Sequence, residues 1–530
     1  MKLKEHIAAG AFHSSAERTD APKCHPETRV AVQDEVVSWI CHGDSDDVPK
    51  EIMWVTGPAG SGKTAIMGSV ADTCEGKGTL GATHFFSSFS ASVDRRSKRY
   101  LVPTLAYQFV RHKAMTQVAD RILSAVEDNP AIFEQNLQVQ FDQLILEPLR
   151  ACRDRPLLPE WPKVILIDGL DECEADQYHD TTRSDLSPRS KEDDQIEILS
   201  VLKKAASDPD FPFRIVIASR PEHCIKHFFT DVANSVTREL FLDEKYDPDA
   251  DMELFLESKF TIIRRQCRLP SSWPREDVRR ALIANASGQF IYVATVGRFM
   301  AESTGDPDQL LNQVLQLPGS KTIGNPLAPL DALYTHILSS SPDSHLSILW
   351  LNLMFRERFL DPAFNGGLPA AFVRLFLESY SGQASHAFRN LNSLVFIPSV
   401  EADNSSYGLY HKSLVDFLQE GSRSGNLYVE SKAVLELLVD RYLHLWKGRG
   451  PERSLTPKEQ KIFYQGFFSV IILTVFSTDS RIGLDEIILS CDVAWWVQYY
   501  LQENGPDGIG TLETIKNLFM IVHQMVSVIV

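Results

Sequence analysis

Cysteine is scarce and scattered in this sequence. The 530 residues include eight cysteines, and no two of them form a C-x-x-C pair. Free thiols in such a pattern are typical of a reducing compartment, so we expect a cytoplasmic protein without a disulfide framework. The spacing of Cys24-His25 and Cys41-His42 matches no common zinc module, and no zinc site is predicted.

Long apolar runs are also missing. The longest strongly apolar run in the C-terminal half covers residues 467–476. It is far shorter than the roughly 20 residues that a membrane-spanning helix needs. The N-terminus has no apolar core long enough for a secretory signal. We therefore expect no membrane span.

Basic residues are in deficit, and sequence repeats are absent. The chain has 53 Lys and Arg against 70 Asp and Glu, which gives a formal net charge of −17. Broad nucleic-acid binding needs phosphate-neutralising cations, so we expect no nucleic-acid partner.

No repeat occurs at a period of roughly 33–45 residues, which excludes ankyrin, TPR and WD40 arrays.

Residues 57–64, in contrast, carry a strong motif. They read Gly-Pro-Ala-Gly-Ser-Gly-Lys-Thr and fit the pattern G-x-x-x-x-G-K-[ST]. The apolar run Ile52 to Val55 precedes them and a helix-compatible run follows, which is the context that a phosphate-binding loop requires. The nucleotide-binding residues predicted from this motif are Gly57, Pro58, Ala59, Gly60, Ser61, Gly62, Lys63, Thr64 and Ala65.

Each residue type in this loop suits a nucleotide triphosphate, which is densely negative. The glycines let the backbone curl and direct N–H groups at the phosphates, and the next helix presents its positive end. We expect Lys63 to reach the β- and γ-phosphates and Thr64 to place its hydroxyl on Mg²⁺. The alternative is a chance Gly-rich turn, against which the flanking strand and helix argue.

A second signal is an aliphatic strand that ends in acids, Val164-Ile165-Leu166-Ile167-Asp168-Gly169-Leu170-Asp171-Glu172. Beside the phosphate loop, such a strand delivers Asp168 to the Mg²⁺ shell. Asp171 and Glu172 are predicted catalytic residues that reach the same metal and a water attacking the γ-phosphate. The alternative is a plain sheet strand capped by acids.

A third signal is the strand that ends at Arg220. Pro221 cannot extend a strand ladder, so the chain must turn there. We expect Arg220 to sense the γ-phosphate and to stabilise charge during transfer, as a third catalytic residue. The alternative is a surface arginine at a strand end. Arg95, Arg96 and Arg99 are expected to lie on a solvated loop rather than to form a charge clamp.

The order of elements favours an α/β architecture. Strands are expected at Ile52–Thr56, Ala82–Ser87, Val164–Asp168, Ile215–Ser219 and Arg238–Leu242. Helices between them favour a parallel sheet that is covered on both faces. The polar stretch 174–195 is expected to be a surface loop. From residue 249 apolar residues recur at a period of about 3.6, which indicates helices.

Near residue 400, helices followed by the short strands Leu394–Ser399 and Tyr407–Tyr410 suggest a winged-helix unit. The predicted domains are 1–50 (N-terminal linker with one helix), 51–245 (P-loop NTPase domain), 246–320 (helical domain), 321–425 (winged-helix-like domain) and 426–530 (C-terminal helical region).

The chain resembles a known family at this point. The small Gly169 after Asp168, followed by Asp171-Glu172, resembles the hallmark of NACHT NTPases of the STAND class. Segments 23–29, 103–108, 217–222 and 286–292 look like stretches before and inside that module in fungal members. The resemblance covers roughly residues 15–430, and it extends to fungal heterokaryon-incompatibility proteins and to nephrocystin-3-like N-terminal modules.

The resemblance implies a P-loop NTPase sheet, a helical domain, a winged-helix domain and a histidine sensor. Residues 409–418 resemble the winged-helix motif whose histidine, here His411, touches the β-phosphate of bound ADP. ADP is then expected to hold the domains closed, and ATP with Mg²⁺ to favour an open form that assembles into homo-oligomers. Its protein partners are unknown. The alternative for His411 is a helix-start histidine without a ligand.

Two positions depart from the family pattern. Many relatives carry Gly where this chain has Glu27. Animal relatives place a proline against adenine where this chain has Gly288-Gln289-Phe290. GTP therefore stays open beside ATP and ADP as the nucleotide.

Two other functions stay open. One is an interaction scaffold that binds nucleotide without hydrolysing it. The other is a plain cytosolic ATPase that acts on a small substrate, although no substrate-pocket motif or lid signature supports it. The steady-state turnover rate separates these from a slowly hydrolysing switch.

Overall fold

The computed structural model describes residues 2–19, 21–43, 50–88, 93–152, 161–175, 189–242, 246–317, 326–355, 368–399, 405–475, 492, 494–496 and 498–499. The chain forms two compact units, Met1–Leu330 and Asp331–Val530. Within the described ranges, no helix combines the length and the apolar character that crossing a bilayer requires.

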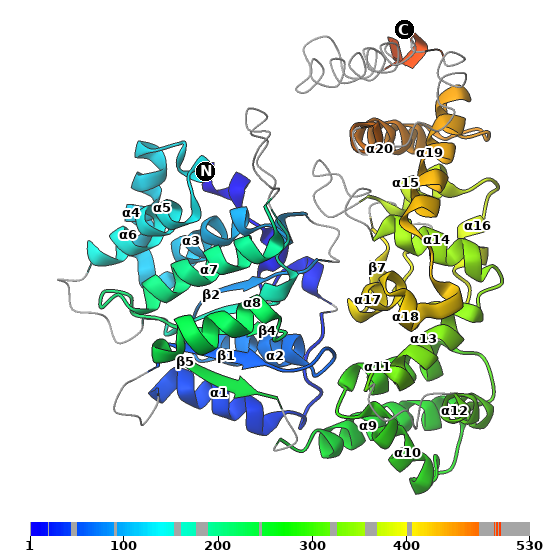
Figure 1. Ribbon diagram of the computed structural model, residues 1–530, viewed down its shortest axis with the longest axis horizontal. Helices are drawn as coiled ribbons and strands as arrows, with labels where there is room; N and C mark the ends of the chain where they lie inside the picture. Colours follow the sequence, from blue (N-terminus) through cyan, green and yellow to red (C-terminus); the bar gives the residue numbers. More distant parts are fainter. Residues whose placement is uncertain are drawn as a thin grey trace. The chain divides into compact units, whose positions relative to one another are not determined.

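The first unit is built on a parallel sheet of five strands in the order β2-β3-β4-β1-β5 (Figure 1). The strands are β1 (Ile52–Thr56), β2 (Leu80–Phe85), β3 (Val164–Asp168), β4 (Arg214–Ser219) and β5 (Thr237–Phe241). The register pairs Thr56 with Ser219 and Asp168 with Ala218. The carboxyl ends of β1, β3 and β4 therefore lie at one level of the sheet edge.

Helices cover both faces of this sheet, because alternate strand residues point to opposite sides. Ile165 and Ile167 belong to the apolar core on one face, and Leu166 and Val216 belong to the core on the other. The first core includes residues of α3 (Leu101–Arg111), α4 (Thr116–Asp128), α5 (Leu137–Phe141), α6 (Glu147–Arg150), α7 (Lys191–Ala206) and α8 (His223–His227); the second includes residues of α1 (Val30–His42) and α2 (Lys63–Gly76). This arrangement confirms the predicted α/β P-loop fold class.

The N-terminal residues, predicted as part of a linker, pack onto the sheet instead. Leu3 is fully buried in the core, and the N–H of Ala8 donates to Oγ1 of Thr104 at 2.9 Å. The N–H of His13 donates to Oγ1 of Thr83 in β2. The segment folds as three short 3-10 helices, Lys2–His6, Ala9–Ala11 and Ala16–Arg18. Such short turns have no sustained apolar period, so the sequence pattern did not reveal their burial.

The expected surface loop at 174–195 is wrong at its C-terminal end. Residues 176–188 of that stretch lie outside the described residues. A capping box between Ser190 and Asp193 starts α7, so residues 191–195 are helical. Asp194 and Gln195 are fully buried despite their polar character.

Four helices follow the sheet in the described part of the first unit, and the first three lie where the apolar period predicted helices. They are α9 (Pro248–Cys267), α10 (Glu276–Ala286), α11 (Phe290–Glu302) and α12 (Pro307–Gln316). Met252, Leu256 and Phe260 follow helical spacing on the buried side of α9. This side packs against α10 and α11.

The second unit is mainly helical. Its elements are α13 (Ala328–Ser339), which leads into it, α14 (Ser344–Met354), α15 (Ala370–Leu377), α16 (Gln383–Ala387), β6 (Val395–Phe396), β7 (Gly408–Leu409), α17 (Ser413–Gln419), α18 (Gly421–Ser424), α19 (Ser431–Lys447) and α20 (Pro457–Val475). β6 and β7 pair antiparallel, within the two short strands that the sequence predicted. The winged-helix assignment and the five domain boundaries stay predictions. Residues 318–325 and most of the chain after 475 lie outside the described residues.

Candidate nucleotide-binding site

The loop between β1 and α2 carries the predicted phosphate-binding residues. β1 ends at Thr56, and α2 begins at Lys63. Gly60 and Gly62 have φ angles of 78° and 91°, a left-handed conformation that glycine adopts without steric cost. The loop therefore curls at the N-terminus of α2, where the helix dipole favours an anion.

The Lys63 ammonium lies across this loop. Its Nζ donates to the carbonyl oxygens of Gly57 at 2.8 Å and of Pro58 at 2.9 Å. Burial lowers the pKa of Lys63 to about 8, against the effect of the Asp171 carboxylate. The loop therefore holds a cation at the point where the motif places the phosphates.

Asp168 ends β3 beside this loop. It is 2% exposed, and the nearby Thr64 hydroxyl favours the charged form of its carboxyl group. Burial raises the pKa of Asp168 to about 6, and the charge of Arg18 acts in the opposite direction. Hydroxyl and carboxylate oxygens are the ligands that Mg²⁺ prefers, so Thr64 and Asp168 fit the metal role predicted for them.

The carboxylate of Asp171 contacts both the backbone and the side chain of Arg220. Gly169, with φ of 71°, turns the chain out of β3 into the short 3-10 helix Leu170–Glu172. Oδ1 of Asp171 then accepts the backbone N–H of Arg220 at 3.0 Å, and Nε of Arg220 lies 3.5 Å from Oδ2. The acid predicted to reach the metal thus engages the predicted phosphate sensor.

Glu172 is held by the chain that follows β2. Its Oε2 accepts the backbone N–H of Ser88 at 2.9 Å, and the Ser88 hydroxyl lies 3.4 Å away. The two acids of the motif therefore contact opposite neighbours of β3: Asp171 contacts the end of β4, and Glu172 contacts the end of β2.

The structure brings the predicted residues of the first unit together at one sheet edge. Lys63 follows β1, Asp168 ends β3 and Arg220 follows β4, which lies between those two strands. The Lys63 charge interacts electrostatically with Asp171, Arg220, Asp168 and Glu172. The cluster combines cations for phosphate, oxygen ligands for a divalent metal and one further carboxylate.

Arg29 is a neighbour of the phosphate loop to which sequence reasoning assigned no role. Its guanidinium donates to the carbonyl oxygen of Ser61 at 3.1 Å and stacks 4.8 Å from the ring centre of Phe290. Its backbone N–H donates to Oδ1 of Asp251 in α9. Arg29 is 4% exposed, and Nη1 has no hydrogen-bond partner among the described residues. The resemblance of segment 23–29 to a family motif was the only available signal.

The start of α11 also contacts the phosphate loop. The N–H of Ile291 donates to the carbonyl oxygen of Gly60 at 3.4 Å, and a Cβ at Gly60 would lie 2.3 Å from Cγ2 of Ile291. Gln289 is buried beside it and donates to the carbonyl oxygen of Pro326. The segment 288–290, where animal relatives have an adenine-contacting proline, thus lies next to the phosphate loop.

Arg95 and Arg96 are buried, so the expected solvated loop is wrong for them. They are 8% and 4% exposed, whereas the Arg99 side chain is 44% exposed. Nε of Arg95 donates to the carbonyl oxygen of Phe85 at 3.2 Å, and Arg96 pairs with Glu174 at 3.5 Å. These partners bury the two arginines, and no local sequence pattern predicts such contacts.

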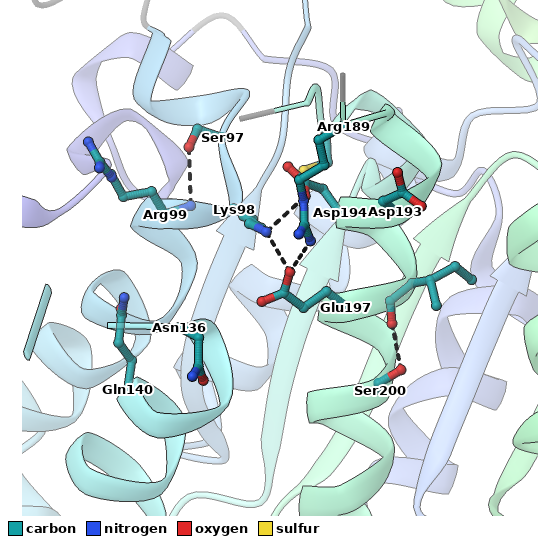
Figure 2. Close-up of polar contacts among 12 residues, drawn as sticks. Ser97, Lys98, Arg99, Asn136, Gln140, Arg189, Asp193, Asp194, Glu197 and Ser200 are labelled. Atoms are coloured by element: carbon teal, nitrogen blue, oxygen red, sulfur yellow. Dashed lines mark hydrogen bonds and ion pairs between the residues drawn. The ribbon is translucent and has the colours of Figure 1, made fainter. Parts of the chain in front are cut away.

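Lys98, from the same stretch, anchors α7 through a partly buried ion cluster (Figure 2). Its Nζ lies 2.8 Å from Oδ1 of Asp194 and 2.5 Å from Oε2 of Glu197, and Arg189 pairs with both carboxylates. Burial opposes the charge of Lys98, but the two carboxylates keep its pKa above the usual value. Gln195 on the same helix donates to the carbonyl oxygen of Asp171, so α7 supports the acid turn.

His411 lies in the second unit, between β7 and α17. Its Nδ1 lies 3.0 Å from the backbone N of Ser413 and 2.6 Å from the Ser413 hydroxyl. The role of His411 as a phosphate sensor stays a prediction.

One comparison with known proteins, a match to a family model, covers the part of the chain that holds the phosphate loop. Residues 30–220 match the family model described as Nephrocystin 3, N-terminal. No curated protein matches the chain. Among solved structures, the chain is similar to that of the Aeropyrum pernix ORC2 protein (ADPNP-ADP complexes), with 14% sequence identity, 82% of this chain and 98% of that chain covered, and a TM-score of 0.29. The family match shows that the segment from α1 to Arg220 is similar to a nephrocystin-3 N-terminal domain.

Proposed function

We propose that this protein is a nucleotide-driven signalling switch of the NACHT/STAND class. It binds ATP or ADP together with Mg²⁺ and hydrolyses ATP slowly, and this cycle controls domain opening and homo-oligomerisation. GTP stays open as a second nucleotide. The observation that carries the proposal is the meeting of Lys63, Asp168 and the Asp171–Arg220 pair at one sheet edge.

Each residue of the cluster has its own role in this proposal. Lys63 and the backbone N–H groups from Gly57 to Ala65, except at Pro58, which has none, bind the phosphates. Thr64 and Asp168 hold Mg²⁺, which neutralises phosphate charge when it is bound. Glu172 orients the attacking water, and Arg220 contacts the terminal phosphate.

Asp171 supports Arg220 in this proposal. Its carboxylate accepts the backbone N–H of Arg220 and forms an ion pair with the guanidinium, so it helps to orient the arginine before the nucleotide arrives. A pre-oriented donor loses less side-chain entropy on binding. Arg220 should therefore distinguish ATP from ADP.

The helical part of the first unit can respond to the nucleotide through α11. The backbone of Ile291 contacts Gly60, and Arg29 joins Ser61 to Phe290 and to Asp251. When bound phosphates reshape the loop, these contacts change. The nucleotide then binds one arrangement of the loop and α11 more tightly than the other, and so shifts the equilibrium between them. His411 adds a contact to ADP in the closed form.

Nucleotide titration tests the proposal. Labelled ADP and ATP are titrated into the wild-type protein, into Lys63→Ala and into Lys77→Ala, which removes an exposed lysine at the far end of α2. We expect Lys63→Ala to weaken binding at least about tenfold, because it removes a charge-assisted contact, and Lys77→Ala to leave binding unchanged. Equal binding by all three proteins would refute the proposal.

A non-hydrolysing scaffold is the second candidate, and the Ser88–Glu172 contact favours it. A carboxylate that already accepts the N–H of Ser88 has one oxygen less for a water molecule. This function predicts nucleotide binding without turnover and unchanged activity in Glu172→Gln. Turnover by the wild type that falls in Glu172→Gln would exclude it.

A further inference from the structure

The surroundings of His411 determine which of its ring nitrogens carries the proton. The backbone N of Ser413 lies 3.0 Å from Nδ1. A backbone N–H can only donate, so Nδ1 must be the accepting nitrogen. The neutral ring then keeps its proton on Nε2.

The hydroxyl of Ser413 extends this assignment. Its oxygen lies 2.6 Å from the same Nδ1. If the hydroxyl hydrogen pointed elsewhere, two lone pairs would face each other at this distance. The hydroxyl therefore donates to Nδ1 as well, and its own oxygen is left as an acceptor.

Tyr334 supplies the donor for that oxygen. Its hydroxyl lies 2.8 Å from Oγ of Ser413. Because the serine hydrogen is committed to His411, the tyrosine must donate to the serine. The hydrogen bonds thus run in one direction, from Tyr334 to Ser413 to His411. Tyr334 is 1% exposed and Ser413 is 2% exposed, so bulk water does not compete for these groups.

The helix that carries Tyr334 is fixed in the same unit. Asp331, one turn earlier in α13, accepts two hydrogen bonds from Arg423 of α18, at 2.7 and 3.1 Å. Such a two-point pair restricts orientation more than a single contact does. Tyr334 therefore has a fixed position from which to orient Ser413.

We propose that Ser413 and Tyr334 are positioning residues that hold His411 in the Nε2–H form. This form is a hydrogen-bond donor at the nitrogen distant from Ser413, whereas the other neutral form presents a lone pair there and would repel a phosphate oxygen. The inference rests on the proposed contact of His411 with a nucleotide phosphate, and it names the residues that make that contact possible.

Nitrogen NMR of the full chain labelled at histidine tests the proposal without any nucleotide. His411→Gln identifies the His411 signals among the 15 histidines. We expect a wild-type spectrum with an unprotonated Nδ1 and a protonated Nε2. A wild-type ring protonated mainly on Nδ1, or an even mixture of the two forms, would overturn the proposal.

Variants then separate positioning from folding. Ser413→Ala removes the hydroxyl but keeps the backbone N–H, so we expect a rise in the Nδ1–H form. Tyr334→Phe should shift the ring in the same direction to a smaller extent, and it serves alone if Ser413→Ala does not fold. Ser413→Thr restores a hydroxyl and should restore the wild-type spectrum.

Ser347→Ala is the matched control, because Ser347 is a fully buried serine of the same unit that hydrogen-bonds to another serine. It should leave His411 unchanged. Identical His411 spectra for the wild type, Ser413→Ala and Tyr334→Phe would also overturn the proposal.

ADP titration completes the test. We expect Ser413→Ala to weaken ADP binding about fivefold, which corresponds to an ordinary hydrogen bond, and Ser413→Thr to bind within about twofold of the wild type. If the wild type shows the expected ring form but binds no nucleotide, the proposed function fails and the positioning roles stand. If the wild type binds ADP and its ring form is wrong, the positioning roles fail alone.

Discussion

The backbone N–H of Arg220 lies 3.0 Å from Oδ1 of Asp171, and the guanidinium of the same arginine lies 3.5 Å from Oδ2. One carboxylate therefore contacts both the backbone at the end of β4 and the side chain of Arg220. Asp171 is 4% exposed, so this interaction is poorly screened by solvent.

Asp171→Asn should weaken ATP binding about five- to tenfold and leave ADP binding within about twofold. The amide still accepts the N–H of Arg220 but loses the ion pair that orients the guanidinium. Parallel titrations of the two nucleotides measure this ratio. Asp277→Asn, at an exposed position of α10, is the control. Equal losses of affinity for ATP and ADP would show that Asp171 stabilises the fold and has no specific role in recognising the terminal phosphate.

Gly60→Ala should disrupt the contact between the phosphate loop and α11. The new Cβ lies 2.3 Å from Cγ2 of Ile291, at a φ of 78° that alanine rarely adopts. We expect a loss of about 1–3 kcal/mol in the free energy of unfolding and a nucleotide affinity at least about tenfold lower. Chemical denaturation and titration measure the two effects.

Two further variants separate steric overlap from backbone strain at this position. Ile291→Ala added to Gly60→Ala removes the clashing methyl and should restore part of the stability. Gly62→Ala has a positive φ but no atom within 4 Å of the new Cβ, so it reports strain alone. If the double variant recovers nothing, the contact with Ile291 does not limit position 60.

Arg29→Met should lower the free energy of unfolding by about 3 kcal/mol, because it keeps the backbone N–H that donates to Asp251 but leaves this largely buried carboxylate without its ion-pair partner. Urea unfolding measures this loss. Arg29→Met combined with Asp251→Asn should lose less than the sum of the single variants, since the two residues contact each other. Arg265→Met, at an exposed position of α9, is the control. Additive losses would contradict the pairing.

Stability should fall in acid because of His84. This side chain is fully buried in β2, and its two ring nitrogens have no hydrogen-bond partner in the described part of the chain. Burial lowers the pKa of His84 from 6.5 to about 3. Between these values the unfolded chain binds a proton that the folded chain does not. The stability that neutral, buried His84 allows is fully present above pH 6.5, and the free energy of unfolding decreases as the pH falls below this value.

At pH 5 this difference amounts to about 2 kcal/mol, which is set mainly by the pKa of the unfolded chain. Denaturation of the wild type and of His84→Phe at pH 7 and pH 5 measures it. The variant should lose about 2 kcal/mol less than the wild type over this interval. His42→Phe, at an exposed position, should lose as much as the wild type. An equal loss in His84→Phe and in the wild type would show that His84 is not buried in the neutral form.

The sequence predicted the sheet closely because β1, β2, β3 and β4 are buried along nearly their whole length. Val164–Asp168 and Ile52–Thr56 agree with the structure at both ends. Continuous apolar runs of this kind have few competing interpretations. β2 is displaced by two residues from the prediction Ala82–Ser87, and a register irregularity occurs near its start, between Leu80 and Ala82.

The contacts that the sequence did not reveal involve isolated cations with distant partners. Arg29 contacts Asp251 across 222 positions, and Lys98 contacts Asp194 across 96. The guanidinium of Arg18 stacks 3.6 Å from the ring centre of Phe85, and Phe85 in β2 is the register partner of Asp168 in β3. No local period marks such residues, because charged side chains are usually exposed unless they find a partner. Only the tertiary structure shows that Arg29 and Arg18 lie near the site and that Lys98 supports it through α7.

Magnesium-dependent nucleotide binding by Lys63→Ala, Asp168→Asn and Arg220→Ala tests the central claim most directly. The account predicts that Lys63→Ala weakens ATP and ADP binding alike, that Asp168→Asn weakens only the magnesium-dependent part, and that Arg220→Ala weakens ATP more than ADP. Wild-type affinities for both nucleotides in all three variants, with and without magnesium, would contradict it.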